Sequence, residues 1–239
     1  MNSSKFSSAL VVAALVGQAH ASPLRLGYFN TFKSDSRMMI AAPHGGFDLN
    51  TDLLALRLVR RLGWSCVAAT GFRKKSRPIN VNRPTEGVGL KSSQERHTED
   101  ARIVYDAFMK HIEEVSPNGI DFYVEIHGMN RPEIYDHIQI ATVGISTDDA
   151  EKIKRLFGRE IAKLGLNYQV TIEGIDDIHF TAMGAKTFGS LKDVSRALHI
   201  ELPWGLRVQQ MTEGVELLAA VLPKVAKLLT CDGRLESVL

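Results

Sequence analysis

This sequence has little cysteine and no excess of charge of either sign. Its 239 residues include two cysteines, 29 lysines and arginines, and 27 aspartates and glutamates. Two cysteines are too few for a disulfide-stapled scaffold or a cysteine-based zinc module. A net charge of +2 gives no large basic field, so we expect no nucleic-acid partner.

Glycine, proline and long hydrophobic runs are not abundant either, which excludes collagen-like, low-complexity and membrane-bundle classes. The apolar stretch Ala9–Val16 is far shorter than the ~20 residues that span a bilayer. It follows Lys5 and precedes Ala19-His20-Ala21, which is the pattern of a secretory signal peptide.

We therefore expect residues 1–21 to be removed and 22–239 to form one catalytic domain, periplasmic or secreted, without a membrane anchor. An oxidising compartment would permit a disulfide between Cys66 and Cys231, and the sequence leaves that pairing open.

Apolar runs of strand length alternate with segments of helical periodicity. The expected strands are 37–43, 65–70, 120–126, 137–144 and 195–202, and the expected helices are 50–62, 99–115, 148–164 and 213–229. This alternation predicts an α/β fold of three αβα layers around a mixed, largely parallel sheet. The polar segment 72–98 is too long for a simple connection, and loops of that length are often functional.

Two short motifs at strand ends carry metal-binding residue types. In Pro43-His44-Gly45-Gly46-Phe47-Asp48, the glycine pair lets the chain turn tightly enough for His44 and Asp48 to chelate one cation. His127 leaves another strand at a glycine. Two imidazoles and one carboxylate, with a position left open to water, are typical of a catalytic zinc site.

Two further motifs suggest the other groups of a hydrolytic site. Asn82-Arg83 lies in the long loop, and the guanidinium of Arg83 suits a substrate carboxylate or a developing oxyanion. Glu201 places a carboxylate in an apolar strand, where it could serve as the general base. Glu125 lies on the same strand face as His127, either as support for that imidazole or as a solvated residue.

Weaker indications come from three more residues. His179 precedes a glycine-containing loop, and Arg131 and Arg207 follow His127 and Glu201 closely in the sequence. Any of them could contact an anionic substrate, and each could equally be a surface residue.

In order and spacing, His44/Asp48, Asn82-Arg83, His127 and Glu201 resemble the zinc carboxypeptidase-like hydrolases, over residues 38 to 207. Within that superfamily the chain is most similar to the N-formylglutamate amidohydrolase family. It also resembles the phage-type poly-γ-glutamate hydrolases, which share the His-Gly-Gly start, an acidic ligand and a following threonine, here Thr51.

The resemblance implies one zinc ion held by His44, Asp48 and His127, with Glu201 as catalytic base. It also implies that Arg83 and Asn82 bind a substrate carboxylate or polarise the scissile carbonyl. Zinc carboxypeptidases place their acidic ligand three residues after the histidine, whereas Asp48 comes four after it, so Asp52 remains a second candidate ligand.

We therefore expect a zinc-dependent amidohydrolase that cleaves an amide bond in an N-acylated, N-formylglutamate-like amino acid. The alternatives are a peptidase acting on poly-γ-glutamate or cell-wall peptide, and a periplasmic protein that binds a metal or small ligand without turnover. The retention of Glu201 argues against the last alternative, because zinc binding alone does not need that carboxylate.

Overall fold

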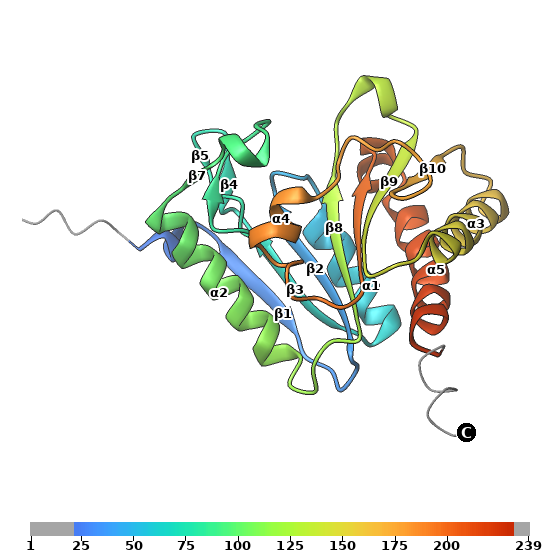
Figure 1. Cartoon of the computed structure of the whole chain (residues 1–239), viewed down its shortest axis with the longest axis horizontal. Helices are drawn as coiled ribbons and strands as arrows, with labels where there is room; N and C mark the ends of the chain where they lie inside the picture. The colour runs from blue at the N-terminus through green and yellow to red at the C-terminus, as the bar shows by residue number, and fades with distance from the viewer. Residues whose placement is uncertain (1–21, 232–239) are drawn as a thin grey trace, which may run out of the picture.

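The computed structural model describes residues 22–231, which form a seven-stranded sheet with helices on both faces (Figure 1). The expected signal peptide, 1–21, lies outside the described residues, as does 232–239. No helix among the described residues is long and apolar enough to span a membrane. The strands lie in the order β1 (Tyr28–Phe32), β3 (Ser65–Thr70), β2 (Met38–Gly45), β8 (Phe122–Gly128), β11 (Ala197–Leu202), β9 (His137–Val143) and β10 (Gln169–Ile172).

The centre of the sheet is parallel, as the sequence predicts. Strands β3, β2, β8 and β11 pair in parallel, and so do β9 and β10. Antiparallel pairing occurs between β11 and β9 and at the β1 edge. The carboxyl ends of β3, β2, β8 and β11 therefore meet at one edge of the sheet, where ligands bind in open α/β folds.

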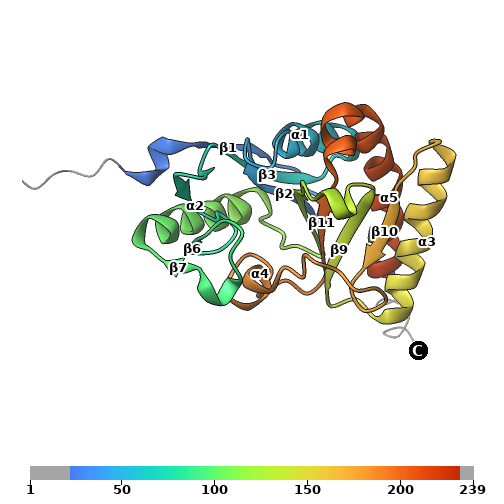
Figure 2. The same cartoon turned by 90° about the horizontal axis from the view of Figure 1, so that it is seen from above.

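Helices cover both faces, which confirms the three-layer expectation (Figure 2). One face carries α1 (Thr51–Leu62), α3 (Thr147–Lys163) and α5 (Met211–Cys231), and the other carries α2 (Glu99–Val115) and α4 (Met183–Phe188). Alternation along β8 serves both layers. Phe122, Val124 and Ile126 pack toward the α1 side, whereas Tyr123 packs in the cluster of the α2 side.

The predicted helices begin and end at recognisable capping residues. The Thr98 side chain accepts a hydrogen bond from the Ala101 amide at the start of α2, and Ser146 accepts one from Asp149 at the start of α3. Gly63 ends α1 in the left-handed conformation with φ 66°, donating its amide to the Val59 carbonyl. These local signals explain why helix bounds read from the sequence lie within a few residues of those in the structure.

The short peripheral elements do not follow from the sequence pattern. They are β1, β10, α4 and two small hairpins inside the long loop, β4 (Arg73–Lys74) with β5 (Arg77–Pro78) and β6 (Thr85–Glu86) with β7 (Arg96–His97). Strand β1 is partly exposed along its whole length, so it lacks the apolar run of a central strand. The other elements are too short to show a hydrophobic period.

Candidate metal centre

The turn after β2 brings His44 and Asp48 together. The register between β2 and β3 shifts between Ala42 and Gly45, and the Asp48 amide then donates to the His44 carbonyl at 2.8 Å. Gly46 has φ +81°, a conformation that favours glycine, and a Cβ on Gly45 would lie 2.6 Å from the Cβ of Asp52. Both glycines of the motif are therefore needed for this turn.

Three ligand atoms converge where this turn meets the end of β8. His44 Nδ1 lies 3.2 Å from Asp48 Oδ2. His127 Nδ1 lies 3.1 Å from His44 Nδ1 and 3.3 Å from Asp48 Oδ2. A tetrahedral zinc ion with ligand bonds of 2.0–2.1 Å needs ligand atoms about 3.3 Å apart. The donor set and its spacing therefore fit a zinc ion.

The opposite nitrogen of each imidazole has its own acceptor. His44 Nε2 lies 2.9 Å from the Asn80 carbonyl oxygen, and His127 Nε2 lies 3.1 Å from Glu125 Oε2. Each Nε2–H therefore donates a hydrogen bond, so Nδ1 is the nitrogen of each ring that faces the ligand position. Such outer contacts fix the tautomer and orientation of metal-binding histidines.

Both acceptors are positioned by one strained turn in the long loop. Val81, between Asn80 and Asn82, is fully buried and has φ +50°, which is rare for a β-branched residue. On one side of Val81 the Asn80 carbonyl meets His44. On the other side the Asn82 amide donates to Glu125 Oε2 at 3.0 Å. The turn thus supports both histidines.

Glu125 is the hub of this network. Its contacts decide between the two interpretations of the sequence, in which it either supports the His127 imidazole or is a solvated residue. It has no exposed surface, so it is not a solvated residue. Its two oxygens accept hydrogen bonds from five side chains: Tyr123, Ser190, Asn82, His127 and His199. A buried carboxylate is stable only when its acceptor capacity is used in this way. Glu125, His127 and His199 also bring three potential ligand atoms close enough together to hold a metal. These atoms, however, are already used in the hydrogen bonds of both histidines to Glu125.

The electrostatics of the three ligands follow from their burial and contacts. Burial, together with the nearby Arg73 charge, lowers the pKa of His44 to about 3. Burial also opposes charge on His127, but hydrogen bonds to Asp48 and Glu125 outweigh it and raise its pKa to about 10. The pKa of Asp48 is lowered, because the two imidazoles outweigh the effect of burial. Without metal at neutral pH, His127 is therefore protonated at both ring nitrogens, whereas His44 is neutral.

Asp52, the second candidate ligand, does not join the cluster. Its Oδ2 accepts a hydrogen bond from Thr70 Oγ1 at 2.7 Å, and its Oδ1 accepts one from the Leu53 amide. The convergent group consists of His44, Asp48 and His127. Thr51 closes the preceding turn by donating to the Asp48 carbonyl. The geometry therefore favours Asp48 over Asp52 as the acidic ligand.

Glu201 lies beside the cluster, as expected for a base. It pairs across the sheet with His127 in the register of β11 and β8. Its side chain is nearly buried, and Glu201 Oε1 lies 3.4 Å from His199 Nε2. His199 was not among the predicted site residues, although it lies two residues before Glu201 and so on the same strand face.

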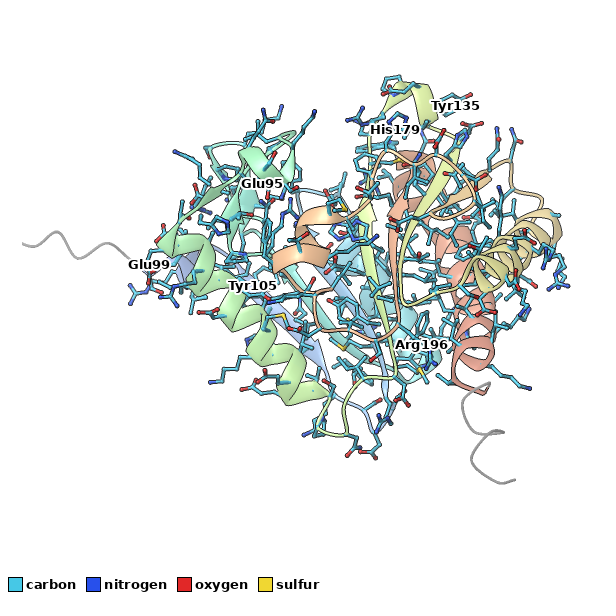
Figure 3. All side chains as sticks on the ribbon, viewed as in Figure 1. Glu95, Glu99, Tyr105, Tyr135, His179 and Arg196 are labelled. Carbon is cyan, nitrogen blue, oxygen red and sulfur yellow. The ribbon has the colours of Figure 1, made fainter. Side chains whose placement is uncertain are left out.

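Arg83 and Asn82 reach the site region but already have partners. The guanidinium of Arg83 forms a bidentate pair with Glu95 at 2.5 and 2.8 Å and also donates to Asn82 Oδ1. Glu95 lies in the hairpin segment on one side of α4, and His179 lies on the other (Figure 3). Binding of substrate by Arg83 thus stays a prediction. It requires the guanidinium either to give up a hydrogen bond to Glu95 or to contact Glu95 and the substrate at the same time.

Arg73 carries no distinctive sequence motif, although its guanidinium contacts a ligand histidine. Its Nη1 lies 3.5 Å from His44 Nε2, and its guanidinium stacks on the Phe47 ring at 4.9 Å. Its partners are the Asn80 side-chain oxygen and the Gly87 carbonyl, and its buried Nε has no hydrogen-bond partner. Burial lowers the pKa of Arg73 to about 10, so it remains charged at neutral pH. Its only sequence signal was membership of the long polar loop.

The three weaker candidates occupy different environments. Gln139 Oε1 accepts the backbone amides of His179 and Phe180, which holds this loop beside Glu201 because Gln139 and Glu201 pair between β9 and β11. The His179 side chain is exposed. Arg131 is exposed, pairs with Glu133 and stacks on Phe180.

Arg207, by contrast, is buried and bonds only to backbone carbonyls. It donates to the carbonyls of Leu49, Met129 and Leu202, which follow the ends of β2 and β8 or end β11. Its position indicates that it ties the site loops together. Cys66 is a free, buried cysteine in the core, and the side chain of Cys231 lies outside the described set.

Comparison with known proteins adds evidence on the fold. No protein-family model and no curated protein matches this chain. The bacteriophage poly-γ-glutamate hydrolase matches with 12% identity and a TM-score of 0.50, over 85% of this chain and 91% of its own. The gene product Atu2144 from Agrobacterium tumefaciens matches with 14% identity and a TM-score of 0.52, over 90% and 100%. The chain has a carboxypeptidase-like fold.

The zinc-free apo form of YNDL shares this fold, with 14% identity and a TM-score of 0.50 over 86% of this chain and 92% of its own. At such identities the likeness establishes the fold alone, so the chemistry must be argued from the side chains.

Proposed function

We propose that this protein is a secreted or periplasmic zinc-dependent amidohydrolase that cleaves the amide bond of an N-acylated, glutamate-like amino acid. The observation that carries the proposal is the convergence of His44 Nδ1, His127 Nδ1 and Asp48 Oδ2 within 3.1–3.3 Å of one another, with Glu201 beside them. Two imidazoles and a carboxylate leave the fourth position of a tetrahedral ion open, as in catalytic zinc sites.

A zinc ion held by these residues would supply a Lewis acid and a water whose pKa is lowered toward ~7. Glu201 accepts the proton of the attacking water and delivers it to the leaving nitrogen. The nearly buried position of Glu201 limits competition from bulk water for that proton. The reaction consumes one water and yields a carboxylate and a free amine.

The cations around the site support an anionic substrate. Arg73 is charged and largely desolvated, and among residues 22–231 it forms no ion pair with a carboxylate, although Asp48, Glu95 and Glu201 are close enough to act on its charge, so it adds positive potential that favours an anionic substrate. Arg83 provides a second guanidinium in the same long loop, and its charge is compensated by Glu95. Small anionic amides or peptides are therefore the substrate class we favour.

The test measures zinc content and amide hydrolysis on the same preparation. We expect about one zinc per chain and release of free amine from N-formyl- or N-acetylglutamate, abolished by a chelator and restored by zinc. Less than about half an equivalent of metal after metal-replete expression would contradict the metal assignment. Poly-γ-glutamate and a cell-wall peptide serve as competing substrates.

The substrates that are hydrolysed, together with the zinc content, decide between the alternative functions. Hydrolysis of the polymer or the cell-wall peptide alone would replace the N-acyl amino acid as substrate, with the zinc mechanism retained. Full zinc occupancy without hydrolysis of any of these amides would favour a binding protein and overturn the proposal.

A further inference from the structure

His199 lies between two carboxylates in the interior of the site. Its Nδ1 is 3.0 Å from Glu125 Oε2, and its Nε2 is 3.4 Å from Glu201 Oε1. The side chain is only 7% exposed. The His199 ring therefore connects Glu125, which supports the ligand His127, with Glu201, which lies beside the three ligands.

The sheet register produces this arrangement. His199 and Glu201 alternate on β11, and they pair in parallel with Glu125 and His127 on β8. The four side chains form two adjacent rows on the same face of the sheet. The His199 ring also stacks on the His127 ring, with centroids 4.1 Å apart and an interplanar angle of 29°. On the other neighbour, β9, the position opposite His199 is the small residue Ala141.

Glu201 depends on this contact. Among residues 22–231, His199 is the one side chain within hydrogen-bond or ion-pair distance of Glu201. A glutamate has three rotatable side-chain bonds, so without a partner its carboxylate would sample several rotamers. His199 cannot move with it, because its ring is fixed by the hydrogen bond to Glu125 and by stacking on His127.

We propose that His199 is a positioning residue, which fixes the carboxylate of Glu201 against the metal cluster by anchoring it to Glu125. This inference rests on the proposed function, since it takes Glu201 as the general base. As a consequence, Glu125 holds both the ligand His127 and, through His199, the general base Glu201. The distance between the ligands and the base is therefore held constant. Misplacement of a reacting group by about 1 Å can cost about 10²-fold in rate.

Two substitutions separate the contacts of His199. In asparagine, the amide nitrogen lies as many bonds from Cβ as Nδ1 of histidine, so His199→Asn keeps the donor to Glu125 and loses the contact to Glu201. In glutamine, the amide lies as far along as Nε2, so His199→Gln places a donor in reach of Glu201 and gives up the one to Glu125. Glu125 then still has four donors.

We expect His199→Asn to bind zinc normally and to lower kcat by about 10- to 100-fold with little change in KM. His199→Gln should recover most of that loss. In a Glu201→Gln background, His199→Asn should cause no further loss, because the group it positions has gone. Equal losses of kcat in the Asn and Gln variants, or an undiminished effect of His199→Asn without Glu201, would overturn the proposal.

Two further measurements complement these, one independent of how the His199 variants fold and the other independent of activity. Glu201→Asp leaves the His199–Glu125 pair intact and withdraws the carboxylate by one methylene. A wild-type kcat in this variant would overturn the proposal. Crystal structures of the zinc-loaded Asn and Gln variants should show the Glu201 carboxylate displaced in the first and retained in the second. If the wild type hydrolyses no amide, the proposed function fails, while these structures still decide whether His199 positions Glu201.

Discussion

At the scale of single residues, each ligand histidine donates a hydrogen bond to the protein from one ring nitrogen, which orients the other nitrogen toward the ligand position. The Nε2 atoms of His44 and His127 donate to Asn80 and Glu125, and only the Nδ1 atoms face Asp48. A histidine whose outer contact were removed could turn its ring or change tautomer and so lose the ligand geometry. The outer acceptors are therefore as much a part of the site as the ligands.

The role of Glu201 gives the first prediction at this scale. Glu201→Gln is nearly isosteric, so fold and zinc content should be retained, whereas kcat should fall by about 10²–10⁴-fold because the proton acceptor is lost. The comparison is made at equal zinc occupancy on an N-acylglutamate. A change confined to KM, or a kcat within about threefold of wild type, would remove Glu201 from the mechanism.

A second prediction separates the two acidic residues of the β2–α1 turn. Asp48→Ala should lose most of its zinc, because Oδ2 of Asp48 lies 3.2–3.3 Å from both Nδ1 atoms. Asp52→Ala removes a partner of Thr70 instead and should keep about one zinc per chain. Elemental analysis of both variants, expressed and purified together, gives the comparison. The reverse pattern would move the acidic ligand to Asp52.

At the scale of elements, the site is assembled from the ends of parallel strands, and Arg207 ties those ends together. Its guanidinium donates to carbonyls from three separate segments, and Gly128 lies directly against it. A Cβ at Gly128 would collide with the guanidinium, so this position needs glycine for space and not for an unusual φ.

We therefore predict that Gly128→Ala lowers the free energy of unfolding by about 1–3 kcal/mol, because displaced Arg207 leaves buried carbonyls without donors. The matched control is Gly158→Ala in α3, where an added Cβ meets nothing within 4 Å. That variant should gain roughly 0.5–1 kcal/mol from helix propensity. Denaturant unfolding of the two variants tests the pair, and equal effects would contradict the account of Gly128.

Elements also show how far the sequence can be read. The main helices and central strands follow from periodicity and capping, and residues 99–115 and 65–70 match α2 and β3 as expected. The edge strands β1 and β10 could not be read in this way, since they are short or half-exposed. The hairpins in the long loop are two-residue ladders whose pairing is set by tertiary contacts.

At the scale of the whole molecule, metal binding is coupled to proton release. In the metal-free protein the pKa of His127 is raised to about 10 and that of His44 is lowered to about 3. At pH 7, His127 therefore carries a proton that zinc must displace, whereas His44 is already neutral. Because acid adds protons that compete with the metal, zinc affinity should fall as pH falls between these two pKa values.

The expected change in zinc affinity is about tenfold per pH unit around neutrality, with about one proton released per ion bound. Competition titrations against a chelator, corrected for the chelator's own protonation, measure the slope. Calorimetry in buffers of different ionisation enthalpy counts the protons. An affinity independent of pH would show that His127 is neutral before the metal binds.

The start of the mature chain is a prediction that also concerns the whole molecule. The apolar run Ala9–Val16 and the Ala19-His20-Ala21 site predict cleavage before Ser22. Expression in a secreting bacterial host followed by N-terminal sequencing of the exported protein should give Ser22 as the first residue. Exported protein that begins at Met1 would contradict the prediction.

The sequence by itself determined the layered α/β architecture and the ends of its strands, because hydrophobic periodicity and capping are local properties. It also identified His44, Asp48, His127 and Glu201 as candidates, since polar residues at the ends of parallel strands share one edge of the sheet. Tertiary structure alone decided the contacts between segments distant in the chain. Asn80 meets His44 across 36 positions and His199 meets Glu125 across 74, and no local pattern encodes such pairs.

The same reason explains why the sequence could not show which of Arg73 and Arg83 is paired with a carboxylate. Both are arginines in a polar loop, but folding places Glu95 against Arg83 and leaves Arg73 beside His44 with no carboxylate of residues 22–231 within ion-pair distance. Which guanidinium is compensated depends on how the loop closes over the sheet. In the closed loop Val81 is fully buried with φ +50°, between the two asparagines that contact His44 and Glu125.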